Sequence, residues 1–291
     1  MNIIERLLAG GPVTADGAWG TELQARGLES GECPDAWNLS HPERVEEVAR
    51  AYVEAGSQLI LTNTFRANRI ALAGTGLADC VAEVNRKGVE ISRRAAAGAA
   101  AVFASIGPSG KMLPAGEVNP DVLYDAFREQ ARALADGGAD ALVVETMSDL
   151  EEARIALAAA QDTRLPVVVS LVFDTGKKRD RTMMGNTPEQ CARELAEAGA
   201  ALFGANCGSG VAGYVEIARR MHALAGLPVW IKANAGLPDL VDGKPVYRMG
   251  PEEFAGYVPA LVEAGARFIG GCCGTNPAFV RAIKERIARC A

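Results

Sequence analysis

Short apolar runs rich in β-branched residues recur along the chain, and segments with helical periodicity separate them. Each run spans four to seven residues and ends in polar or glycine residues. The eight runs are Val13 to Asp16, Leu59 to Asn63, Val102 to Ile106, Ala141 to Glu145, Val167 to Phe173, Leu202 to Asn206, Val229 to Ala233 and Phe268 to Gly271. Strands that alternate with helices predict parallel pairing through right-handed crossovers.

One phrase introduces several of these runs. It appears as YVEAGSQLILTN, ALADGGADALVVE, ELAEAGAALFGAN and LVEAGARFIGGC, in which a helix closes on glycine and a strand follows within one to three residues. Glycine directly after a helix accepts the left-handed conformation that ends it. The recurrence therefore indicates repeated units of helix and strand.

Eight such units suit a closed (β/α)8 TIM barrel with an interior filled by side chains. Because α/β barrels routinely reach about 250 residues as one unit, we predict a single α/β barrel domain over residues 1–291. A doubly wound open sheet is the alternative, although no GxGxxG motif follows the first strand. The longest irregular stretches are expected to be loops at strand ends. They are Gly27 to His41, Phe173 to Pro188 and Asn234 to Pro251.

Composition narrows the class of protein. Hydrophobic residues make up 49% of the chain and charged residues 23%, which allows a large core, and no apolar run is long enough to span a membrane. The N-terminal segment carries Glu5 and only a short apolar patch, unlike a signal peptide. A net charge of −6 without a basic face argues against nucleic acid as a partner. We expect a cytoplasmic protein that acts on a small molecule or a protein, and the oligomeric state stays open.

Polar residues at the ends of the predicted strands are the candidates for a functional site, because catalytic groups of this fold lie at the carboxyl ends of the strands. They are Asp16, Asn63, Glu145, Asn206, Cys207, Asn234, Cys272 and Cys273. The three asparagines are expected to satisfy loop backbone groups. The other four cysteines lie in loop or helix contexts, and we assign them no role.

Three of the candidates form a cysteine constellation. Cys207 stands in ANCGSG after the sixth strand, and Cys272 and Cys273 stand in GGCCGT after the last, so all three project from one rim of the barrel. Adjacent cysteines rarely bond to each other, whereas three thiolates can fill three corners of a tetrahedral zinc site at Zn–S distances of ~2.3 Å. The open fourth corner is typical of a catalytic zinc. Buried free thiols at strand ends are the alternative.

A zinc ion with thiolate ligands and one open position can bind an incoming thiol and hold it as a thiolate near neutral pH. Three cysteine thiolates leave the centre with a charge of −1, so a fourth thiolate stays electron-rich enough to attack a carbon electrophile. Zinc that activates water more often uses histidine and carboxylate ligands. The chain has two histidines, His41 and His222, and neither is placed as a ligand. The pattern predicts alkyl transfer to sulfur.

Together these residues resemble the homocysteine S-methyltransferase family, which includes the homocysteine-binding module of cobalamin-dependent methionine synthase and betaine homocysteine methyltransferase. The resemblance covers nearly the whole chain, through DGAWGTEL, TNTF, SIGPSG, ET, GANCG, KANAGLP and GGCCGT. It implies a zinc-dependent barrel that methylates homocysteine to methionine. The residues that it assigns are Cys207, Cys272 and Cys273 to zinc and Asp16, Gly17 and Glu145 to the substrate.

The chemistry of homocysteine agrees with these substrate residues. Its ammonium needs an anion, which Asp16 and Glu145 can supply, and its carboxylate needs donors, which the backbone N–H groups of Gly17 and Ala18 can supply. The alternatives are a turn-capping role for Asp16 and a structural ion pair for Glu145.

The methyl donor would be a sulfonium, an ammonium or a corrinoid compound. Quaternary ammonium groups are normally held by aromatic cages. The cage tyrosines of the betaine enzymes correspond to Arg66 and Thr146 here. Trp19 and Trp37 could build a different cage, and packing at the barrel mouth is the alternative for either residue. The segment DLVDGKPVY resembles the corrinoid-dependent methionine synthases, and methylcobalamin would have to arrive on a separate protein.

Two other functions stay open. In one, a corrinoid protein is the partner, and the barrel demethylates a different methylated substrate. In the other, the barrel is not an enzyme, and its vicinal thiols sense zinc or the redox state.

Overall fold

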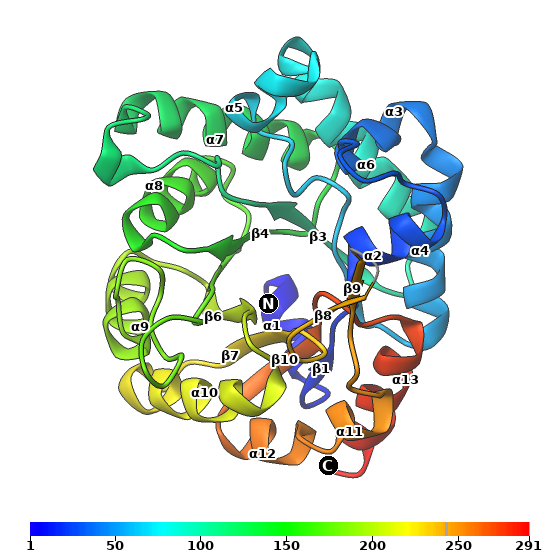
Figure 1. Ribbon diagram of the computed structural model, residues 1–291, viewed down its shortest axis with the longest axis vertical. Helices are drawn as coiled ribbons and strands as arrows, with labels where there is room; N and C mark the ends of the chain where they lie inside the picture. Colours follow the sequence, from blue (N-terminus) through cyan, green and yellow to red (C-terminus); the bar gives the residue numbers. More distant parts are fainter. Residues whose placement is uncertain (242–243, 291) are drawn as a thin grey trace.

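Eight parallel strands form the barrel wall in the computed structural model, which describes residues 1–241 and 244–290 (Figure 1). They are β1 (Val13–Thr14), β2 (Leu59–Ile60), β3 (Ala101–Ile106), β4 (Ala141–Met147), β5 (Val167–Leu171), β6 (Leu202–Cys207), β7 (Val229–Ala233) and β10 (Ala266–Gly271). Their order is β1-β10-β7-β6-β5-β4-β3-β2, and every pair is parallel. Each strand falls on one of the eight predicted runs, so the predicted TIM barrel is confirmed.

Helices surround the strands (Figure 1). The longer ones are α4 (Pro42–Ala55), α6 (Val81–Ala96), α7 (Pro120–Asp136), α8 (Leu150–Gln161), α9 (Pro188–Glu197), α10 (Val211–Ala225) and α13 (Pro277–Ala288). Shorter α-helices are α1 (Ile3–Leu8), α2 (Trp19–Ala25), α3 (Trp37–Ser40), α5 (Arg69–Leu72), α11 (Pro251–Ala255) and α12 (Val258–Glu263). Within the described residues, no helix is long and apolar enough to cross a membrane.

The repeated glycine phrase ends helices as predicted. Gly56 caps α4 with φ of 100°, and the glycines at the matching positions after α7, α9 and α12 also have positive φ. These three are Gly138, Gly199 and Gly265, with φ of 90°, 81° and 97°. A side chain at these positions would strain the left-handed turn that carries the chain from the outer helix back into the wall.

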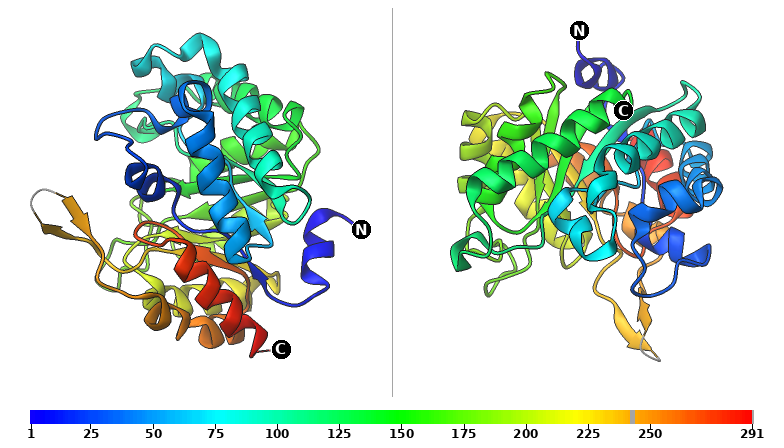
Figure 2. Two further views of the ribbon diagram at one scale, coloured as in Figure 1. Left: turned by 90° about the vertical axis from the view of Figure 1, so that its right-hand side faces the viewer. Right: turned by 90° about the horizontal axis from the view of Figure 1, so that it is seen from above.

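Alternation along the strands divides the core into two layers. One set of side chains packs between the wall and the helices, and the other fills the interior, where Trp230 stacks between Phe103 and Phe268 with ring centroids 6.3 Å and 5.7 Å away. Ile4 of α1 joins this interior cluster. Figure 2 shows α1 at one end of the barrel and the β8–β9 hairpin at the other. The apolar interior thus lies between α1 and the mouth at the carboxyl ends of the strands, and it forms the floor of that mouth.

The seam between β1 and β2 is closed largely by side chains. Gln58 donates its backbone N–H to the Thr14 carbonyl over 2.8 Å, and its side-chain oxygen accepts the Thr14 N–H over 2.9 Å. The Leu61 N–H donates to Asp16 Oδ2 over 2.7 Å. These contacts replace regular ladder bonds, which explains why both strands end earlier than the sequence predicted.

The segment Asn234 to Pro251 was predicted to be a loop. The structure differs, because the segment contains an antiparallel hairpin. Strands β8 (Asp239–Val241) and β9 (Lys244–Val246) pair in the register Asp239 with Val246. The hairpin projects beyond the barrel wall (Figure 2), and the Leu240 side chain on it is 80% exposed. Among residues 1–241 and 244–290 these two strands pair only with each other, so the periodicity of the barrel repeats gave no signal for them.

Candidate active site

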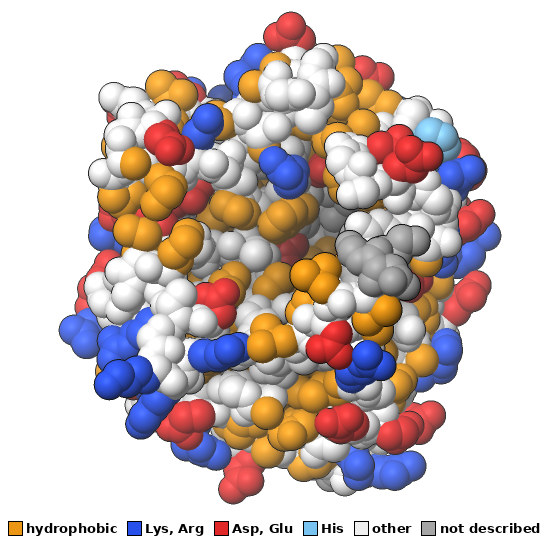
Figure 3. Space-filling model, in the orientation of Figure 1, with side chains coloured by type: hydrophobic (Ala, Val, Ile, Leu, Met, Phe, Trp, Pro, Cys, Tyr) orange, Lys and Arg blue, Asp and Glu red, His pale blue; other side chains and the backbone are white. Residues whose placement is uncertain are grey.

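A cavity of about 370 Å³ opens at the carboxyl end of the barrel. Figure 3 shows the hollow near the middle of this face, with hydrophobic side chains around it. Its lining includes all three predicted zinc cysteines together with Gly17 and Glu145. Asp16 is fully buried directly beside it. Residues separated by more than 250 positions in the sequence therefore meet in one site.

The three cysteines converge as the strand ends predicted. Cys207 Sγ and Cys272 Sγ lie 2.8 Å apart, and the sulfur atoms of Cys207, Cys272 and Cys273 all lie within 4.8 Å of one another. A tetrahedral site with metal–sulfur bonds of ~2.3 Å has sulfur–sulfur edges of ~3.8 Å, so Cys207 and Cys272 would move apart by about 1 Å around an ion, and no pair of sulfurs is farther apart than 4.8 Å. The three side chains can therefore share one thiophilic metal ion.

The thiols influence one another strongly. Hydrogen bonds from Cys207 and then from Cys272 lower the pKa of Cys273 to about 3, although burial opposes this. The pKa of Cys207 is raised by its hydrogen bonds with Cys272 and Cys273 and by burial. For Cys272, the hydrogen bond with Cys207 lowers the pKa, but the bond with Cys273 and burial outweigh it. Ionisation of Cys273 is thus favoured, whereas ionisation of Cys207 and Cys272 beside it is opposed, and a divalent cation would offset the repulsion among three thiolates.

The Asn206 side chain holds Cys207 in place. Its Nδ2 lies 3.6 Å from Cys207 Sγ and donates to Thr146 Oγ1 over 2.6 Å. Its Oδ1 accepts the Thr146 N–H over 2.9 Å and the Ser170 hydroxyl over 2.7 Å. Asn206 was expected to satisfy loop backbone; the backbone N–H that it accepts belongs instead to Thr146 in β4, and the structure adds a contact with the sulfur.

Two further side chains border the sulfur cluster. Asn234 donates to the Gly208 carbonyl over 2.7 Å, while its buried Oδ1 has no hydrogen-bond partner among the described residues. Tyr247, which follows β9, shares a hydrogen bond with Cys273 that contributes to the lowered pKa of that thiol. Sequence reasoning missed Tyr247.

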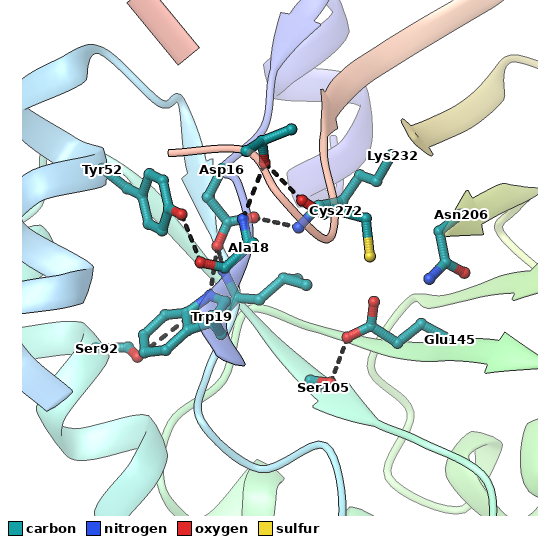
Figure 4. Close-up of polar contacts among 12 residues, drawn as sticks. Asp16, Ala18, Trp19, Tyr52, Ser92, Ser105, Glu145, Asn206, Lys232 and Cys272 are labelled. Atoms are coloured by element: carbon teal, nitrogen blue, oxygen red, sulfur yellow. Dashed lines mark hydrogen bonds and ion pairs between the residues drawn. The ribbon is translucent and has the colours of Figure 1, made fainter. Parts of the chain in front are cut away.

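Three buried charged groups lie deeper in the cavity (Figure 4). Lys232 of β7 pairs with Asp16 Oδ1, and Asp16 Oδ2 accepts the Trp19 indole N–H over 2.8 Å. Glu145 of β4 accepts the Ser105 hydroxyl over 2.5 Å. Burial raises the pKa of Glu145, and the nearby Lys232 partly offsets this. Asp16 and Glu145 are thus brought together as predicted, with a lysine between them that the sequence analysis did not single out.

The turn after β1 supplies one backbone donor, not two. The Ala18 N–H already donates to Thr275 Oγ1 over 3.1 Å, so the expectation that it faces the substrate carboxylate is wrong. Gly17 lines the cavity, and a Cβ there would lie 2.8 Å from the Tyr52 ring and hydroxyl. The Tyr52 hydroxyl is fixed by a 2.6 Å bond to the Ala18 carbonyl. Glycine is therefore required for this close approach.

The outer cavity wall does not contain the expected tryptophan pair. Trp19 lines the cavity, but Trp37 is buried elsewhere, with its ring 4.7 Å from the His41 ring. Phe65 and Asp35 lie on the wall instead. Asp35 accepts the Arg66 backbone N–H over 2.9 Å, and burial raises the pKa of its carboxyl to about 6. The sequence pattern did not indicate Asp35, which lies in a 3-10 turn, Pro34–Ala36, within a segment expected to be a loop.

A (β/α)8 barrel with three converging thiols and buried carboxylates at its mouth defines a candidate thiolate metalloenzyme. Residues 13–287 match the homocysteine S-methyltransferase family, and the chain belongs to that family. It is 32% identical over 299 residues to a methionine synthase from Mycobacterium leprae and 32% identical over 297 residues to a methionine synthase from Mycobacterium tuberculosis. These matches cover 96% and 95% of the chain, but the chain spans only about a quarter of each relative, 24% in both cases.

Among solved structures, the fold is similar to the metallated form of the homocysteine methyltransferase MmuM from Escherichia coli. The TM-score is 0.82 at 28% sequence identity, and the match covers 98% of this chain and 100% of that one. The similarity therefore extends over the whole of that chain.

Proposed function

We propose that the protein is a zinc-dependent S-methyltransferase that transfers a methyl group to homocysteine and forms methionine. The main observation in support of this proposal is that the sulfur atoms of Cys207, Cys272 and Cys273 lie within 4.8 Å of one another, in the cavity that Glu145 also lines. The family membership and the similarity to MmuM support this substrate.

Cys207, Cys272 and Cys273 would hold the zinc ion, which when bound favours the thiolate form of an acceptor thiol. Glu145 binds the ammonium of homocysteine through the carboxylate oxygen that Ser105 leaves free. The Gly17 N–H donates to the substrate carboxylate. Asp16 fixes the turn between β1 and α2 through Trp19 and Leu61 and contributes negative charge beside the substrate. Trp19 and Phe65 exclude water from the side of the cavity where a methyl donor approaches.

The donor is either a small methylated compound or methylcobalamin bound to a corrinoid-carrying protein or module. The methionine synthase relatives favour the second source. A corrinoid is too large to enter a cavity of about 370 Å³ whole, so its carrier would have to dock at the mouth. The reverse use of the barrel, demethylation of another substrate for a corrinoid protein, is the competing function. A cytoplasmic location is proposed because reduced thiols persist there.

A donor screen tests the proposal. Zinc-loaded protein is incubated with homocysteine and one methylated donor at a time, including methylcobalamin, and methionine is measured. We expect one zinc ion per chain and methionine from at least one donor. Cys207→Ala should lose both, whereas Cys80→Ala, which changes a half-buried thiol outside the cluster, should keep both. Full zinc and activity in Cys207→Ala would show that the ligand assignment is wrong. Zinc binding without methylation of homocysteine by any donor would favour a sensor or another acceptor.

A further inference from the structure

Lys232 places a positive charge inside the barrel mouth. Lys232 is 2% exposed. It follows Trp230 by two residues in β7, so both side chains lie on the interior face of that strand. On the neighbouring strand β10, Gly270 pairs with Lys232. Because glycine has no side chain, the Lys232 side chain can extend across β10 to Asp16, which follows β1. A lysine that spans a neighbouring strand in this way is held at a defined depth in the cavity.

The contacts of Asp16 show what holds the ammonium there. One carboxylate oxygen of Asp16 pairs with Lys232, and the other accepts the Trp19 indole and the Leu61 backbone N–H. Burial alone would lower the pKa of Lys232, but Asp16 and Glu145 outweigh burial and raise it. Lys232 is therefore an ammonium ion whose position Asp16 fixes.

The Lys232 ammonium has capacity left for a ligand. It carries three N–H donors, and among the described residues Asp16 is its one hydrogen-bond partner. Lys232 also lines the cavity, as Glu145 does, and Figure 4 shows both side chains directed toward the space beside Cys272. A cation and an anion thus flank the place next to the metal-binding sulfurs.

We infer that Lys232 is a specificity-determining residue that binds the carboxylate of the acceptor thiol, that Asp16 positions it, and that Glu145 binds the ammonium. This inference rests on the proposed function, because it assigns the two charged ends of a thiol-bearing α-amino acid. Asp16 then acts mainly through Lys232 rather than as the principal partner of the substrate ammonium. The site selects α-amino acid thiols over thiols that lack either charge.

Thiol binding to zinc-loaded protein tests the inference without a methyl donor. Calorimetry compares homocysteine with 3-mercaptopropylamine, which lacks the carboxylate, and with 4-mercaptobutanoate, which lacks the ammonium. In Lys232→Met, affinity for homocysteine should fall by about 10- to 100-fold, the usual effect of losing hydrogen bonds to a charged group, while affinity for 3-mercaptopropylamine changes by about twofold or less. Glu145→Gln is the matched control, which should lose affinity for 3-mercaptopropylamine but keep that for 4-mercaptobutanoate.

Lys232→Met alone leaves the buried Asp16 carboxylate without its lysine partner, which could destabilise the fold. The double variant Asp16→Asn with Lys232→Met controls for this effect, because it removes both charges of the pair. It should show the same loss of discrimination for the carboxylate. An equal loss of affinity for homocysteine and 3-mercaptopropylamine in both variants would overturn the inference and leave Lys232 a structural ion-pair partner. A wild-type protein that prefers 4-mercaptobutanoate to homocysteine would overturn the proposed substrate while supporting the role of Lys232. Absence of binding by all three thiols would contradict both.

Discussion

Asn206 and Thr146 are joined by two hydrogen bonds across the carboxyl ends of β6 and β4. The Thr146 N–H donates to Asn206 Oδ1 over 2.9 Å, and Asn206 Nδ2 donates to Thr146 Oγ1 over 2.6 Å. Thr146 has φ of 61°, and Cys207, the proposed ligand next to Asn206, has φ of 58°; non-glycine residues rarely adopt this left-handed conformation. The paired contacts compensate this strain and aim the Cys207 sulfur at the other two thiols.

Asn206→Ala should therefore weaken zinc binding although it removes no ligand. Loss of a group that orients a metal ligand typically lowers affinity by about 10- to 100-fold. Competition with a zinc chelator measures the change. Asn119→Ala, which removes an exposed helix cap far from the sulfurs, is the control and should leave zinc affinity unaltered. Equal zinc affinity in Asn206→Ala and the wild type would show that the backbone holds Cys207 without this side chain.

Gly17→Ala should damage both stability and homocysteine binding. The added Cβ would lie 2.8 Å from the buried Tyr52 side chain, whose hydroxyl is already bonded, so the turn must shift. Overpacking of this kind costs about 1–3 kcal/mol of unfolding free energy. Gly20→Ala, with nothing within 4 Å of the new Cβ, should not destabilise the protein. Urea unfolding and homocysteine titration of both variants check this, and a Gly17→Ala protein that matches Gly20→Ala would contradict the steric argument.

The barrel and the three cysteines could be predicted because local signals determine both. Strand periodicity and the repeated glycine phrase specify the wall, and a cysteine placed directly after a strand must project from the carboxyl end of the barrel. Asp16 and Glu145 were found by the same argument, since each ends a predicted strand, although in the structure Asp16 follows β1 and Glu145 lies within β4.

Other site residues depend on tertiary structure. Asp35 and Tyr247 lie outside the helix-strand repeat, and only the folded chain brings Asp35 to the cavity and Tyr247 to Cys273. Lys232 was detectable in principle, because it follows the inward-facing Trp230 by two residues, but a lysine in a strand is ordinarily expected to be solvated. The buried Asp16 carboxylate that compensates its charge is 216 positions away in the sequence.

Zinc should stabilise the fold measurably. The three sulfurs meet only in the folded protein, so zinc binds the folded state and not the unfolded chain. Free zinc at 1,000 times its dissociation constant would contribute about 4 kcal/mol. This corresponds to an increase in Tm of roughly 8 °C. Scanning calorimetry of metal-free and zinc-loaded protein measures it, with Cys207→Ala as the control that should show a much smaller shift. An equal increase in Tm in that variant would mean that zinc binds elsewhere.

Asp35 should make stability depend on pH in an unusual direction. Burial raises the pKa of its carboxyl from 3.8 to about 6, so the folded state binds this proton more tightly than the unfolded state. The resulting stabilisation is complete below about pH 4 and is lost as pH rises through 6, for a total of about 3 kcal/mol. Asp35→Asn keeps the acceptor for the Arg66 N–H without the titration, so relative to wild type it should gain about that amount between pH 4 and pH 7. Urea unfolding at both pH values measures the gain, and Asp136→Asn controls for the loss of one negative charge. A difference between Asp35→Asn and wild type that does not change with pH would show that the Asp35 carboxylate is not destabilised by burial.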